Sequence, residues 1–65
     1  MASLPDSQLS ALASSIEDLS GRIASLAEQL TGDGASESAS ILFEVERTLL
    51  MANRSVNRAR RALPG

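Results

Sequence analysis

Arginine is the only basic residue type in this chain, and the spacing of four arginines is its clearest chemical signal. Residues 47, 51, 54, 58 and 61 follow one another at steps of four and three, which places them on one side of an α-helix. Four of them are arginines, whose guanidinium groups bind carboxylates and phosphates through paired hydrogen bonds. We therefore predict a partner-binding surface, the arginine stripe, made of Arg47, Arg54, Arg58 and Arg61. The simpler alternative is a solvated face that pairs partly with acidic residues of the preceding helix.

Charge is divided unevenly along the sequence. Residues 1–46 hold all eight acidic residues and one arginine, for a net charge of −7, whereas residues 47–65 hold five arginines and no acid, for +5. The predicted partner of the arginine stripe is an acidic protein surface. A nucleic acid contacted through its phosphates is an alternative, but the overall charge of −2 and the single aromatic residue, Phe43, disfavour it. A phosphorylated small ligand is the remaining alternative.

Catalytic and metal-binding chemistry has little support in the composition. Histidine, cysteine and lysine are absent, so the serines lack a base to activate them, and no thiolate or Glu-x-x-His metal site can form. Glu44 and Glu46 are two positions apart, which points them in different directions on a helix. The Gly32-Asp33-Gly34 segment is typical of a turn rather than a phosphate loop. We expect no enzyme activity, no metal and no cofactor.

Two heptad repeats predict the elements that position these residues. In the first, apolar residues recur at steps of three and four: Leu9, Leu12, Ile16, Leu19, Ile23, Leu26 and Leu30. In the second, the same steps connect Leu42, Val45, Leu49, Ala52, Val56, Ala59 and Leu63. If Leu9 and Leu42 are position a of a heptad abcdefg, these residues occupy positions a and d, the pattern of a coiled coil. We predict helices over about 5–31 and 36–62, joined by a turn at 32–35.

The ends of the predicted helices carry their own signals. Pro5 is typical of a first helical turn, and Gly32 is typical of the residue that ends a helix with a positive φ. A turn this short makes the two helices antiparallel. Position a of one helix then faces position d of the other, with Leu26 opposite Leu42 and the bend centred on Gly34.

The predicted fold class is all-α, with one domain over 1–65 folded as an antiparallel helical hairpin of the coiled-coil type. A parallel dimer formed through the first helix alone is the competing arrangement, because Ile at a and Leu at d favour it. That arrangement leaves the second heptad repeat without a partner. Two ion pairs are also expected, Asp6 with Arg60 between the helices and Asp18 with Arg22 within the first one.

A hairpin of two helices covers little apolar surface, so we predict a homodimer that forms a four-helix bundle. Small residues flank the a positions, and larger apolar residues lie beside them. The predicted dimer interface consists of Ala24, Ala27, Ala39, Phe43 and Leu50. The alternative is that Phe43 folds over the turn end of its own hairpin.

Neither a membrane span nor a secretion signal is predicted. The longest clear apolar run is Ile41-Leu42-Phe43, far short of the roughly 20 residues that cross a bilayer. The first six residues lack the basic and apolar regions of a signal peptide. We expect a small cytoplasmic module, regulatory or protein-binding, that docks an acidic partner through the arginine stripe.

Overall fold

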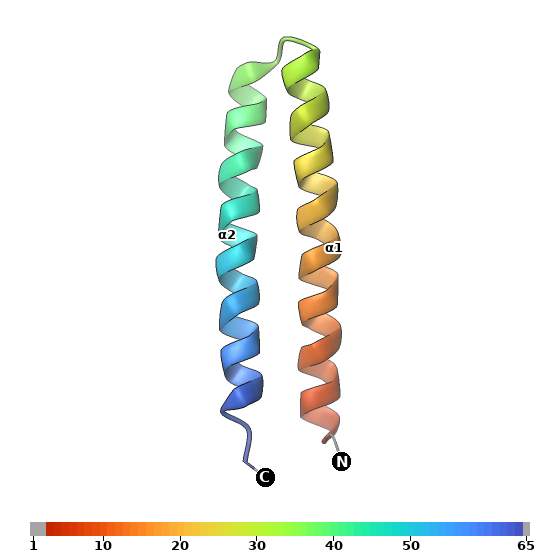
Figure 1. Ribbon diagram of the computed structural model, residues 1–65, viewed down its shortest axis with the longest axis vertical. Helices are drawn as coiled ribbons and strands as arrows, with labels where there is room; N and C mark the ends of the chain where they lie inside the picture. The colour runs from red at the N-terminus through yellow and green to blue at the C-terminus, as the bar shows by residue number, and fades with distance from the viewer. Residues whose placement is uncertain (1–2, 65) are drawn as a thin grey trace.

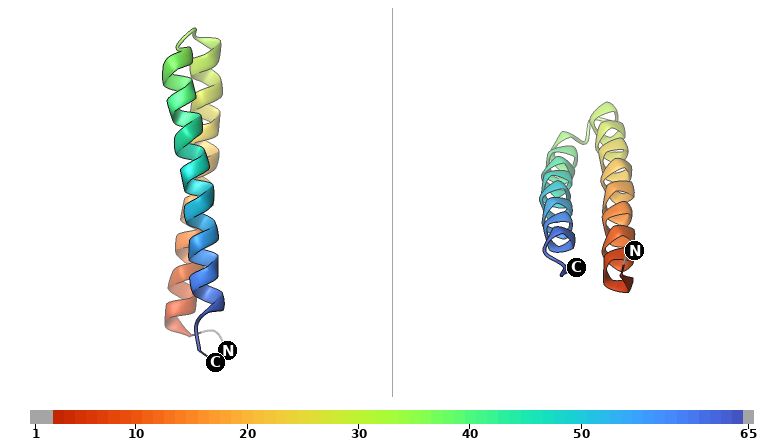
Figure 2. Two further views of the ribbon diagram at one scale, coloured as in Figure 1. Left: turned by 90° about the vertical axis from the view of Figure 1, so that its left-hand side faces the viewer. Right: turned by 60° about the horizontal axis from the view of Figure 1, so that its bottom comes forward.

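Two antiparallel helices and a tight turn make up the computed structural model, which describes residues 3–64 (Figure 1). Helix α1 spans Leu4–Gly32 and helix α2 spans Ser36–Arg61. The two helices lie side by side over their whole length, so the molecule is a single layer measuring 51 × 14 × 9 Å between Cα atoms (Figure 2). The predicted helical hairpin is confirmed, and each helix end differs from its predicted position by no more than one residue.

Helix α1 begins at a serine cap. Ser3 has extended backbone angles, and its side-chain Oγ accepts a hydrogen bond of 3.2 Å from the backbone N–H of Asp6. This satisfies one of the amides that a first helical turn leaves without a partner. Pro5 lies in the same turn, where its missing N–H removes nothing that the helix needs. Because Ser3 supplies the cap, the carboxylate of Asp6 remains available for an interaction between the helices.

The turn between the helices is fixed by Gly34. Its φ is +83°, whereas Gly32, which the sequence pointed to for this role, is the last residue of α1. The N–H of Ala35 donates to the carbonyl of Leu30 at 2.8 Å, and the N–H of Gly34 donates to the carbonyl of Thr31 at 3.2 Å. These two bonds are the Schellman pattern that ends a helix on a left-handed residue. Any residue with a Cβ is disfavoured in that conformation, so the glycine sets where the chain reverses.

The contact between the helices differs from the predicted one. The buried residues of the described chain are Ser20, Ala27 and Ala39, and all three occupy position e rather than a or d. The predicted core leucines at position d, Leu12, Leu19 and Leu26, are 54%, 43% and 46% exposed. The helices therefore meet through positions a and e, and the predicted pairing of a with d, including Leu26 with Leu42, is wrong.

Small side chains explain this rotation. An ion pair joins Asp6 to Arg60, and counting along antiparallel helices from that pair places Ala27 opposite Ala39. Both alanines are essentially inaccessible, at 0% and 2% exposure, because two facing methyl groups let the helix backbones approach closely. The contact formed by positions a and e is called the closed seam below.

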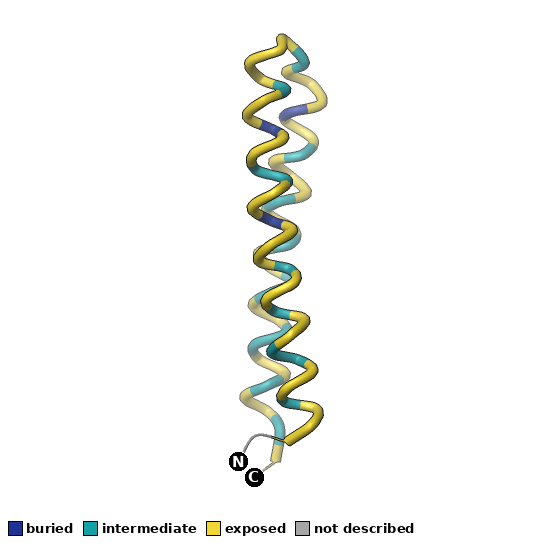
Figure 3. The backbone as a smooth tube through the Cα atoms, turned by 90° about the vertical axis from the view of Figure 1, so that its right-hand side faces the viewer, coloured by how far each residue is buried: buried dark blue, intermediate teal, exposed yellow. Residues whose placement is uncertain are grey.

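The closed seam leaves most of the apolar surface uncovered. No large side chain in the part of the chain that the structure describes is fully buried. Exposed and half-buried residues alternate along both helices, and buried positions are few (Figure 3). The hairpin thus has two broad faces that are open to solvent, one on either side of the closed seam.

Candidate partner-binding surface

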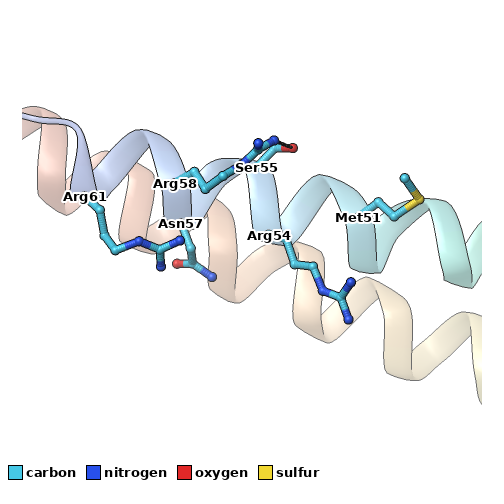
Figure 4. Close-up of a pocket in the computed structure, with 6 residues that line it drawn as sticks. All are labelled: Met51, Arg54, Ser55, Asn57, Arg58 and Arg61. Carbon is cyan, nitrogen blue, oxygen red and sulfur yellow. Dashed lines mark hydrogen bonds between the residues drawn. The ribbon is translucent and has the colours of Figure 1, made fainter.

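The arginine stripe lies on the side of α2 that points away from α1. Arg47, Arg54, Arg58 and Arg61 are all exposed. Three of them line a shallow depression of about 490 Å³ together with other residues of the same helix (Figure 4), namely Met51, Ser55 and Asn57. The spacing predicted that these arginines lie on the outer part of one helix. In the structure all four belong to α2 and are exposed.

Side-chain directions divide the stripe. Arg54 and Arg61 point to one side of α2 with Asn57 between them, whereas Arg58 points to the other side (Figure 4). There its Nη2 donates a hydrogen bond of 2.9 Å to the Oγ of Ser55. The structure therefore brings Arg54 and Arg61 onto a common side and separates Arg58 from them.

The stripe carries positive charge that no acid balances within the described residues. The one ion pair found between residues 3 and 64 joins Arg60 Nε to Asp6 Oδ1 at 3.2 Å, as predicted, and both side chains are about one-third exposed. None of the four stripe arginines takes part in it. Arg54, Arg58 and Arg61 repel one another at spacings of three and four, which costs a few tenths of a kcal/mol per pair. No ion pair between acids of α1 and the stripe is found in the described chain, and the exposure of all four arginines also fits the simpler alternative of a solvated face.

The other predicted ion pair is also not formed. Asp18 and Arg22 are not within 4.0 Å of each other in the described chain, so the prediction of that pair is wrong. Both residues are exposed on α1, and pairs of this kind gain only about 0.2–0.5 kcal/mol, too little to fix two long side chains in place.

Folding into a hairpin converts the charge difference along the sequence into a charge difference along the rod. Residues 24–46, which form the half of the molecule around the turn, contain five acids and no arginine, for a net charge of −5. The other half combines residues 3–23 and 47–64 and has a net charge of +3. The arginine stripe thus belongs to the positive end of a polar rod.

An apolar component adjoins the arginines on α2. Phe43, Arg47, Leu50, Arg54, Asn57 and Arg61 follow one another at steps of four and three, so they form one continuous line along the helix. Phe43 and Leu50 are exposed. The arginines and these two apolar residues were predicted as parts of two separate surfaces, although their spacing already placed them on one line.

The predicted dimer interface is not a continuous surface of the hairpin. Ala27 and Ala39 lie in the closed seam of their own chain and offer no surface to a second copy. Ala24 is half-buried, while Phe43 and Leu50 are exposed on the outer side of α2. The five residues therefore separate into two buried alanines, one half-buried alanine and two exposed residues, and they do not form one exposed surface.

The geometry favours an extended partner over an enclosed ligand. The depression is built by side chains of one helix, so a small molecule in it would be covered on one side only, whereas ligand pockets enclose most of their ligand. Between residues 3 and 64 no three acidic side chains gather in a way that could hold a metal ion. Guanidinium groups in a row next to an aromatic ring suit a chain that presents carboxylates and apolar side chains in turn.

Comparisons with family models, with curated proteins and with solved structures found no match to this chain. Within the described residues, neither helix contains an apolar stretch long enough to cross a membrane.

Proposed function

We propose that this chain is a non-enzymatic protein–protein interaction module, regulatory in role, that docks an acidic partner through the arginine stripe. The single observation that carries this proposal is the set of four exposed arginines without an acidic partner in the described chain. Positive charges that repel one another on one helix are stabilised when a partner brings carboxylates to them.

Phe43 and Leu50 add specificity to this surface. They are apolar residues in line with Arg47, Arg54 and Arg61, so a partner helix or extended segment meets apolar and basic positions alternately. Buried aromatic anchors and arginines provide most of the binding energy in typical protein interfaces. The partner we propose is accordingly an acidic segment with apolar residues between its carboxylates.

The proposal also includes two copies of the chain in a four-helix bundle in the cytoplasm. The part of the hairpin between residues 3 and 64 has three buried residues and thus little core of its own, and a second layer of helices would supply one. Two arginine stripes on one dimer would bind two acidic segments, and linked segments would bind more tightly than single ones.

A binding assay with defined probes tests the docking surface. The first probe is a labelled acidic peptide with glutamates and two leucines spaced to reach Phe43 and Leu50, and the others are a short DNA duplex and inorganic phosphate. We expect the peptide to bind most tightly. The double variant Arg54→Ala/Arg58→Ala should weaken binding about tenfold or more, because each charge-assisted contact contributes on the order of 1 kcal/mol at an exposed site.

Arg22 provides the matched control. It is exposed on α1, outside the stripe, so Arg22→Ala and Arg54→Ala remove the same charge from different places. Arg22 lies on the side of α1 that a second copy would cover, so the two variants are compared at a concentration where sedimentation equilibrium gives them the same mass. We expect Arg22→Ala to change peptide affinity less than twofold and Arg54→Ala to reduce it severalfold. Equal losses would show that only net charge matters. Tighter binding of the duplex, with an affinity that falls steeply as salt rises, would favour the nucleic-acid alternative.

A further inference from the structure

We infer that a second copy of the chain covers the broad face formed by position d, and that the two hairpins lie antiparallel, with the turn of one over the termini of the other. The inference rests on the dimer part of the proposed function and identifies its interface. It replaces the predicted interface, whose Ala27 and Ala39 are occupied within one chain. The surface in question is called the leucine face and consists of Leu12, Leu19, Leu26, Ile41 and Val45.

Exposure of large apolar residues is the first observation. Nine large apolar residues are exposed in the described chain, and five of them form the leucine face. These five residues are not scattered. The d residues of α1 recur every seven residues, and Val45 is a d residue of α2 on the other side of the closed seam. The half-buried residues at position a lie between the d residues of α1 and the d residues of α2. The apolar surface therefore extends across both helices. An exposed surface of this kind marks an interaction site.

Charge is almost absent from this side of the hairpin. Within the two helices, no d position is charged, and the only charged residue at a g position is Arg22. The other charged residues of the helices occupy positions b, c, e and f. The opposite broad face carries Glu17 and Glu28 from α1 and the stripe arginines from α2. A surface with apolar residues and almost no charge fits another surface of the same composition, and a second leucine face has it.

The geometry of helix bundles explains why this side stays open. In a four-helix bundle each helix contacts two neighbours, one on either side of its a and d lines. The closed seam uses the side next to position e. On the remaining side, the g positions of both helices are mostly small or uncharged, and all are exposed: Gln8, Ser15, Arg22, Gln29, Ile41, Thr48, Ser55 and Ala62. A second hairpin would supply the missing neighbour there and enclose the a and d residues in one core.

The size of the face matches what a stable dimer needs. The hairpin spans 51 Å by 14 Å between Cα atoms, a footprint of roughly 700 Å² before side chains are added, and a standard interface buries about 800 Å² per partner. A short peptide would cover only part of this length. A second copy has the same length and the same seven-residue repeat, so it covers the whole face.

Charge complementarity determines the relative orientation of the two copies. The half around the turn carries −5 and the half with the termini carries +3. Antiparallel hairpins place the negative half of each copy beside the positive half of the other. Parallel hairpins would bring the two negative halves together, which is unfavourable and most strongly so at low salt.

A matched pair of leucine substitutions tests the face. Leu19 and Leu50 are 43% and 49% exposed in one chain, but Leu19 lies on the leucine face and Leu50 on the opposite one. We expect sedimentation equilibrium to give twice the single-chain mass for the wild-type protein and for Leu50→Glu. Leu19→Glu should raise the dissociation constant of the dimer at least roughly 100-fold, because each copy then buries a carboxylate among leucines. The helical circular dichroism signal of each variant monitors folding.

Distances between spin labels test the orientation without disturbing the face. Ser36 is exposed beside the turn, and the chain has no cysteine, so Ser36→Cys gives one label per copy. Antiparallel hairpins place the two labels close to the 51 Å length of the rod apart, whereas parallel hairpins place them within about 25 Å, a few helix diameters. This measurement decides the orientation alone; if Leu19→Glu loses its helical signal, the milder Leu19→Gln takes its place in the test of the face.

The outcomes separate the inference from the proposed function. Dissociation by Leu50→Glu but not by Leu19→Glu, or a label distance below about 25 Å, overturns the inferred interface or orientation and leaves the dimer in place. A single-chain mass for the wild-type protein up to about 1 mM overturns the inference and the proposed dimer together. The docking of acidic peptides by the arginine stripe is then still judged by its own assay.

Discussion

The closed seam and the leucine face lie on opposite sides of the residues at position a, and they bury the wrong kinds of residue for a protein core. On the closed seam, the residues at position e are small or polar, and Ala27, Ala39 and Ser20 are buried. On the leucine face, large aliphatic residues such as Leu12 and Leu26 are about half exposed. In a finished core, large apolar residues are buried and small polar ones lie at the surface. The hairpin therefore leaves its large apolar residues more exposed than the small residues of the closed seam.

The largest change in stability is expected when a residue of the closed seam is made larger. Ala27→Leu places a branched side chain at a position with no accessible surface, and we expect a loss of about 3 kcal/mol in the free energy of unfolding. Ala11 is exposed on the same helix, so Ala11→Leu should change stability by less than about 0.5 kcal/mol. Urea denaturation at one protein concentration measures both. Equal effects would contradict the close contact at Ala27.

Most of the fold was predictable from the sequence, because the signals that define it act over short stretches of the chain. Heptad spacing, Pro5 and the glycines at the turn act within a few residues, so they predicted both helices and the reversal between them. The Asp6–Arg60 pair also followed from antiparallel counting. The side on which the helices meet did not follow, because residues at d and e both lie next to position a. The choice between them depends on how closely two backbones can approach, which Ala27 and Ala39 decide only when they face each other.

The candidate site was also predictable only in part. The spacing of the arginines predicted their common location on the outer side of one helix, because it depends on the helix alone. That Arg58 turns toward Ser55, away from Arg54 and Arg61, depends on side-chain torsions that the spacing does not contain. The absence of an acidic partner for the stripe within the described chain required knowledge of where the acids of α1 lie.

Ser20→Ala is expected to change stability less than Ala27→Leu and to raise it instead of lowering it. Its Oγ is buried in the closed seam without a hydrogen-bond partner among the described residues. Ser20→Ala removes the unsatisfied hydroxyl and improves helix propensity, so we expect stability to rise by about 1 kcal/mol. Ser25→Ala, at exposed position c on the outer side of the same helix, should gain only the propensity, about 0.5 kcal/mol. Thermal unfolding followed by circular dichroism compares the two, and a loss of stability on Ser20→Ala would contradict the assigned environment.

The smallest effect is expected at the ion pair that fixes the register of the closed seam. Asp6→Asn removes the charge that binds Arg60, whose side chain is still about one-third exposed. Solvent screens such a pair, so we expect a loss of about 0.5 kcal/mol that shrinks as salt is added. Asp18→Asn, on the same helix and without an ion-pair partner in the described chain, should show no such salt-dependent loss. A salt-independent loss at Asp6 would show that the pair is not the cause.

The mass of the unmodified chain in solution tests the central claim, that a single hairpin is incomplete and associates with a second copy. Sedimentation equilibrium over a wide concentration range, at moderate salt, measures it without labels or substitutions. The claim predicts a weight-average mass that rises with concentration to twice the 6.8 kDa of one chain. A mass that stays at 6.8 kDa at every concentration would contradict it.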